Sequence, residues 1–94
     1  MRKQKNLGAG KLQAGRDKIY IVAYSGCEGS DYCAFCEKDA AVKDVDAEFR
    51  NTIAVLKSQG YKITVACDET LRKELYVPDT GIYHEWEITE STLE

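Results

Sequence analysis

The sequence lacks any long apolar run, and this absence limits what the chain can be. A membrane-spanning helix needs about 20 consecutive, mostly apolar residues, and no segment of the 94 residues approaches that length. The basic N-terminus is not followed by the apolar segment that characterises a secretory signal. We therefore expect a cytoplasmic protein with neither a membrane span nor an export signal.

Proline and histidine are also scarce, with one residue of each, Pro78 and His84. A single proline combined with a hydrophobic content of 44% argues against a disordered chain. His84 could be an additional metal ligand or a base. It lies in an alternating stretch beside Trp86, however, where a packed histidine with one satisfied ring nitrogen is the more common outcome.

The net charge of −3 conceals an uneven distribution along the chain. Residues 1–18 hold six basic side chains and one acidic side chain, whereas residues 19–94 hold seven basic and fifteen acidic ones. We predict a flexible basic leader over residues 1–17 and a single α/β domain over residues 18–94. The acidic domain disfavours binding to nucleic acid, which leaves only the leader for such a contact or for an acidic partner.

Hydrophobic periodicity predicts a strand, a long helix and a second strand in succession. Residues 19–24 form a β-branched and aromatic run that is typical of a strand buried on both faces. Residues 26–32 are rich in glycine and polar side chains, which indicates a loop. A helix should begin near Glu37 or Lys38 and end near Gln59, with Gly60 in the position after the cap. Its apolar stripe consists of Val42, Val45, Phe49, Ile53 and Leu56.

The second strand is expected over residues 61–67, so the three elements form a βαβ unit with parallel strands and a right-handed crossover. Residues 69–75 could form a short helix, and residues 77–81 a turn. Residues 82–88 alternate and indicate an antiparallel strand. The predicted fold is a small α/β domain with a three-stranded mixed sheet and one main helix.

Four cysteines are the strongest chemical signal in the sequence. Cys27, Cys33 and Cys36 lie within ten residues of one another, and Cys67 ends the predicted second strand. In a parallel βαβ unit, the carboxyl ends of both strands lie at one edge of the sheet. That topology would bring all four thiols together.

One interpretation is a structural zinc site with Cys27, Cys33, Cys36 and Cys67 as ligands. Two cysteines separated by two residues can hold one ion, and four thiolates complete a tetrahedral site. Iron or an iron–sulfur cluster would use the same ligands. Because such a site leaves no open coordination position, the protein would be a metal-binding interaction module rather than a metalloenzyme.

A second interpretation is a redox dithiol formed by Cys33 and Cys36 at the start of the helix. The helix dipole lowers the pKa of a thiol placed there and so favours the nucleophilic thiolate. The order of strand, Cys33-Ala34-Phe35-Cys36, helix, strand and Pro78 before a last strand resembles the thioredoxin/glutaredoxin-like family. The resemblance implies a thiol–disulfide oxidoreductase in which Cys33 attacks, Cys36 resolves and Pro78 is a cis-proline facing the dithiol.

A third interpretation is that the cysteines have no chemical role and are small buried apolar residues.

The six tyrosines are numerous for so short a chain. Tyrosine is enriched at protein interfaces because one end of it is apolar and the other polar. We therefore expect a protein partner or a homodimer, although ordinary packing within the sheet would account for the tyrosines as well.

Overall fold

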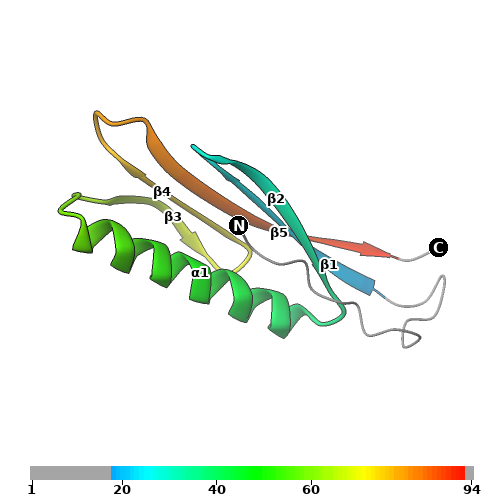
Figure 1. The fold of residues 1–94 in the computed structure, drawn as a ribbon. Coiled ribbons are helices and arrows are strands. Elements are labelled where there is room, and N and C mark those ends of the chain that lie inside the picture. Colours follow the sequence, from blue (N-terminus) through cyan, green and yellow to red (C-terminus); the bar gives the residue numbers. More distant parts are fainter. Residues whose placement is uncertain (1–17, 93–94) are drawn as a thin grey trace.

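The structure is a computed structural model that describes residues 18–92. The predicted basic leader, residues 1–17, lies outside the described residues, as do residues 93–94. The described elements are β1 (Lys18–Gly26), β2 (Gly29–Phe35), α1 (Lys38–Ser58), β3 (Thr64–Glu69), β4 (Arg72–Val77) and β5 (Ile82–Thr92) (Figure 1).

The strands form one five-stranded sheet in the order β2-β1-β5-β4-β3, and every neighbouring pair is antiparallel. Helix α1 lies along one face of this sheet (Figure 1). We call this the covered face and the opposite one the open face. The predicted three-stranded mixed sheet with a parallel βαβ core is therefore wrong. β1 and β3 are not neighbours, and both β5 and β4 lie between them.

Two local hairpins account for the difference. The stretch predicted as a loop over residues 26–32 pairs with β1 instead, through a two-residue turn at Cys27 and Glu28. Gly29, with φ of 131°, closes this turn in a conformation that other residues rarely adopt. The segment predicted as a short helix over residues 69–75 forms the β3–β4 turn and most of β4. Antiparallel pairing across a short turn needs no long crossover, so it displaces the parallel arrangement.

The apolar run in β1 was predicted to be buried on both faces of the sheet. In the structure, one face of the strand is buried more deeply than the other. Val22 points to the covered face and is completely buried. Ile21 and Ala23 alternate with it, lie on the open face and are only half-buried. A near-continuous apolar run can therefore belong to an antiparallel strand whose second face is merely partly shielded.

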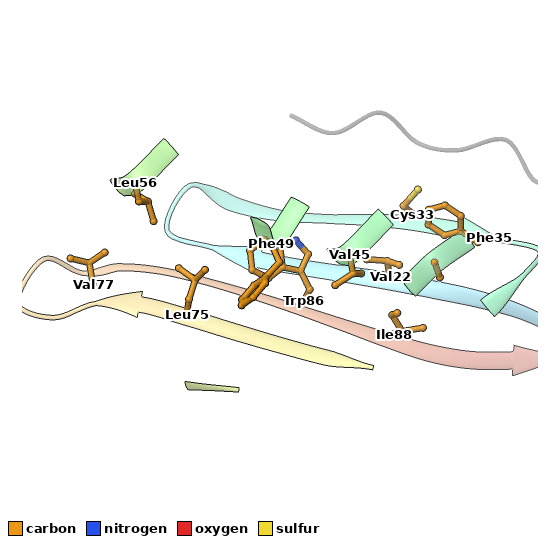
Figure 2. Packing of buried hydrophobic residues seen from close by; sticks show 11 residues of the cluster. Val22, Cys33, Phe35, Val45, Phe49, Leu56, Leu75, Val77, Trp86 and Ile88 are labelled. Carbon is orange, nitrogen blue, oxygen red and sulfur yellow. The ribbon is translucent and has the colours of Figure 1, made fainter. Parts of the chain in front are cut away.

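The core lies between α1 and the covered face (Figure 2). The helix and its apolar stripe are confirmed, since Val45, Phe49 and Leu56 are buried and Val42 and Ile53 pack against the same cluster. The edge of the Phe49 ring meets the face of Trp86, with ring centroids 5.8 Å apart. The sheet contributes Val22, Cys33, Phe35, Leu75, Val77, Trp86 and Ile88.

The C-terminal end of α1 has the closing motif that the sequence predicts. The backbone N–H of Gly60 donates to the carbonyl of Lys57 at 2.9 Å, and that of Tyr61 donates to the carbonyl of Leu56 at 3.1 Å. These two bonds define a Schellman motif, which requires a left-handed residue after the cap. Gly60 supplies it with φ of 89°.

We expect Gly60→Ala to lower the free energy of unfolding by about 1–2 kcal/mol, because a Cβ is disfavoured at left-handed φ. Chemical denaturation followed by circular dichroism measures this change. Gln59→Ala is the matched control, since Gln59 is exposed and has φ of −91°. Equal effects of the two substitutions would contradict the role of Gly60.

Candidate functional site

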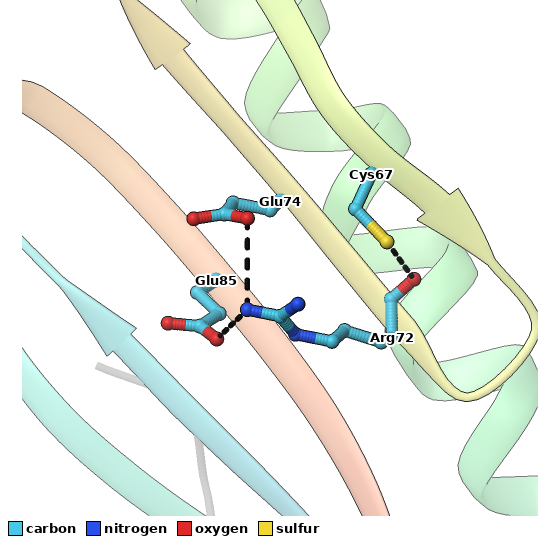
Figure 3. A network of polar contacts seen from close by, with 4 residues as sticks. All are labelled: Cys67, Arg72, Glu74 and Glu85. Carbon is cyan, nitrogen blue, oxygen red and sulfur yellow. Dashed lines mark hydrogen bonds and ion pairs between the residues drawn. The ribbon is translucent and has the colours of Figure 1, made fainter.

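The structure spreads the four cysteines over the domain. Cys27 lies in the β1–β2 turn and is exposed, and Cys36 lies in the short connection between β2 and α1. Cys33 is in the middle of β2, 1% exposed, within the core on the covered face. Cys67 lies on β3, where its thiol donates to the carbonyl of Arg72 at 3.5 Å beside the ion pairs of the open face (Figure 3).

Cys33 and Cys67 are too far apart in this fold to share a metal ion. β2 and β3 are the two outermost strands, and four interstrand spacings amount to about 19 Å. Sulfur ligands of zinc lie about 2.3 Å from the metal. Within residues 18–92, no group of three or more histidine, cysteine, aspartate or glutamate side chains is placed to hold a metal ion. The predicted convergence of the four thiols depended on a parallel βαβ unit. Because the sheet is antiparallel, the four thiols do not come together.

The residues of the predicted dithiol occupy different environments. Cys33 belongs to a strand rather than to the first turn of a helix. Cys36 comes directly before Glu37, the N-cap of α1. None of the four cysteines is in a disulfide. Pro78 begins the β4–β5 turn, and no peptide bond in the described part of the chain is cis. The dithiol therefore stays a prediction, and the redox activity with it.

Thiol labelling distinguishes these environments. We expect a thiol-reactive reagent to modify Cys27 at least about 100-fold faster than Cys33, because Cys33 reacts only when the core opens. Mass spectrometry of peptides from the labelled protein gives both rates, and labelling in denaturant provides the control in which the two become similar. Protection of all four thiols that a chelator abolishes would instead support the predicted zinc site.

A cavity of about 550 Å³ lies between the β1–β2 hairpin, β5 and the middle of α1. Its walls carry Tyr24 and Asp31 from the hairpin, Glu48 from the helix, and His84 and Trp86 from β5, with Glu28 at the turn. The register explains the gathering of these residues, since Tyr24 is paired with both Asp31 and Trp86. The volume falls within the range typical of pockets for small ligands.

Aromatic rings line one side of the cavity in a connected row. Tyr24, His84 and Trp86 have mutual ring-centroid distances of 5.4–5.9 Å. The Tyr24 hydroxyl lies 2.6 Å from Nδ1 of His84. The Trp86 indole N–H donates to Oε1 of Glu48 at 3.1 Å, which ties the row to α1. These contacts fix the aromatic wall from three separate elements.

Gly26 provides the space for the Tyr24–His84 contact. It lies directly opposite His84 in the sheet and two residues after Tyr24, on the same face. A Cβ atom at this position would overlap the Tyr24 hydroxyl and lie 3.2 Å from Nδ1 of His84. The tyrosine can lie along its own strand only because residue 26 has no side chain.

Burial holds the Tyr24–His84 pair in its neutral form. Removal from water lowers the pKa of His84, and the charge of Glu28 opposes this only in part. Burial also raises the pKa of Tyr24, with further contributions from nearby Cys27, Glu28 and Glu48. With both groups neutral, one proton lies between the Tyr24 hydroxyl and Nδ1 of His84, and the tautomer of the histidine decides which of the two donates.

One carboxylate oxygen of the cavity lacks a hydrogen-bond donor. Oδ1 of Asp31 accepts the backbone N–H of Tyr32 at 2.9 Å. Oδ2 of Asp31 is inaccessible to solvent and has no partner among the described residues. A buried acceptor left in this state is costly unless something donates to it.

His84 should titrate below its ordinary value of 6.5. A folded-state pKa lowered in this way stabilises the native state above the unfolded-state pKa, and this contribution is lost as pH falls from about 6.5 through the folded value. Because His84 is the only histidine, a proton NMR titration of its ring reports the pKa directly. The same titration in denaturant gives the reference, and a native midpoint equal to it or higher would contradict this assignment.

Sequence reasoning considered His84 as a metal ligand or a base, favoured a packed residue and did not identify the cavity. The signal it lacked was the β1–β2 hairpin, since Asp31 reaches the covered face only when residues 29–35 form a strand.

On the open face, Arg72 forms ion pairs with Glu85 at 2.6 Å and with Glu74 at 3.6 Å (Figure 3). Arg72 is therefore already engaged in structural pairs.

Comparison with protein-family models, with curated proteins and with solved structures finds no match to this chain. The resemblance to thioredoxin/glutaredoxin-like proteins thus has no independent test. No helix among residues 18–92 combines the length and apolar character needed to cross a membrane.

Proposed function

We propose that this protein is a small-ligand-binding domain whose site is the cavity between α1 and the β1–β2 hairpin. The observation that carries the proposal is the cavity itself, which joins the wall formed by Tyr24, His84 and Trp86 to three acidic side chains, Glu28, Asp31 and Glu48. Apolar rings combined with a few convergent polar groups are the usual composition of a ligand site. This proposal keeps the predicted class of binding module but assigns its site to this cavity instead of to the cysteines.

The earlier predictions about cofactor, partner and location are still open. A zinc site and a Cys33–Cys36 dithiol remain predictions that the placement of the cysteines does not support. A cytoplasmic location is part of the proposal, because four cysteines outside disulfides suit a reducing compartment. The exposed Tyr32, Tyr76 and Tyr83 lie on the open face, which supports a protein partner or a homodimer.

A matched pair of helix variants tests the site. Asn51 lines the cavity and is exposed, so Asn51→Phe should fill the cavity without disturbing the core. Ala54→Phe is the control, because Ala54 is exposed on the same helix and is not among the lining residues. We expect small-molecule fragments to bind the wild type and Ala54→Phe, and to bind Asn51→Phe at least about tenfold more weakly.

Two-dimensional amide NMR with a fragment library measures this binding and maps it. Cationic, neutral and anionic fragments are all included, so that the test does not depend on the charge of the ligand. The expected perturbations are at Tyr24, Asp31, His84 and the Trp86 indole. Perturbations confined to the open face, or equal binding by Asn51→Phe and Ala54→Phe, would contradict the proposed site.

A further inference from the structure

We propose that the ligand of this cavity is a small organic cation, a primary or secondary amine with an apolar body. The inference depends on the proposed function, since it names the chemical class that the same cavity would bind. Three features lead to it, namely the sign of the charge around the cavity, the hydrogen-bond acceptors that its carboxylates supply and the aromatic wall.

The charged side chains that line the cavity are all acidic. Glu28 enters from the β1–β2 turn, Asp31 from β2 and Glu48 from α1, and no lysine or arginine is among the lining residues. Lys73, on the covered face of β4, is the sheet neighbour of Trp86 and forms an ion pair with Asp68. Carboxylates on three sides favour a cation and disfavour an anion of the same size.

The carboxylate of Asp31 distinguishes among cations by the hydrogen bonds that it can accept. The side chain of Asp31 lines the cavity together with those of Glu28 and Glu48, and carboxylate oxygens accept hydrogen bonds. A protonated amine supplies both an N–H donor and a positive charge, and such charge-assisted bonds are about twice as strong as neutral ones. A quaternary ammonium ion supplies the charge without the donor and would leave the carboxylates without such a bond.

The aromatic wall accounts for the apolar body. Tyr24, His84 and Trp86 present ring atoms on the side of the cavity formed by β1 and β5. Aromatic faces attract cations as well as apolar groups. Since the neutral Tyr24–His84 pair adds no positive charge, it does not repel an ammonium group.

Four probes with the same phenyl group separate these features. Phenethylamine carries the ammonium group, 3-phenyl-1-propanol is neutral, 3-phenylpropionate is anionic, and phenethyltrimethylammonium has charge without an N–H donor. We expect phenethylamine to bind at least about tenfold more tightly than each of the other three, as measured by amide NMR titration of the full chain at neutral pH.

Asp31→Asn tests the role of the negative charge at this position. The substitution preserves size and the Oδ1 acceptor but removes the charge and the second acceptor. We expect phenethylamine binding to fall at least about tenfold, because the cavity loses one of its three carboxylates, and the thermal midpoint shows that the variant is still folded. Glu87→Gln is the control, since it removes an exposed negative charge from the open face and should leave binding unchanged.

The outcomes separate this inference from the proposed function. Tighter binding of the alcohol or the acid in the cavity would overturn the amine assignment and retain the ligand site. Perturbation of the cavity residues by Mg²⁺ or Zn²⁺ without any effect of phenethylamine would also overturn it, in favour of a metal. If no probe and no library fragment binds in the cavity at millimolar concentration, both proposals fail.

Discussion

The pairing of β1 with β5 is the interaction on which the rest of this structure depends. It joins the first and last described strands over nine paired positions, from Lys18 with Thr92 to Gly26 with His84. Outside this pair, every strand contact is a hairpin between sequence neighbours. Without β1–β5 pairing, the β1–β2 hairpin and the β3–β4–β5 meander would be connected only through α1. The partners are separated by roughly 60–70 residues, so this pairing also carries the largest loop-closure cost in forming the sheet.

The candidate site is a direct product of that pairing. Tyr24 lies opposite Trp86 and Gly26 lies opposite His84 in the β1–β5 register. Because side chains alternate between the faces of a sheet, a slip of one residue would move Tyr24 away from the covered face and remove the Tyr24–His84 contact. The missing side chain of Gly26 fixes the register locally, since only this glycine accommodates the tyrosine hydroxyl beside Nδ1 of His84. The aromatic wall and the sheet are therefore specified by the same residues.

An element of this fold can be predicted from the sequence when the residues that specify it lie close together in the chain. The stripe of α1 and the glycine at its end are encoded within about twenty residues, and both are confirmed. The strand over residues 82–88 is also confirmed, although β5 extends to Thr92. The strand pairing was not predictable in the same way, because Cys27-Glu28 is not among the dipeptides typical of a tight hairpin turn. Because β2 runs antiparallel to β1, it reverses the chain direction before α1 begins. The sheet is therefore antiparallel, and the cysteines are separated. The cavity was missed for the same reason, since Asp31 was assigned to a loop.

The polar side chains of the cavity take positions where apolar side chains would extend the core. Phe49 and Trp86 form an edge-to-face contact in the core, yet the preceding residue of the helix, Glu48, and Asp31 of β2 place carboxylates at its boundary. An apolar side chain at position 31 would continue the core formed by Cys33 and Phe35 on the same face of β2. Aspartate there gives up this packing and leaves Oδ2 buried without a donor. Local departures from good packing are expected where a protein binds something, because binding residues are retained for contacts with the ligand rather than for packing. Asp31 is such a departure, and it faces the same cavity as Tyr24, His84 and Trp86.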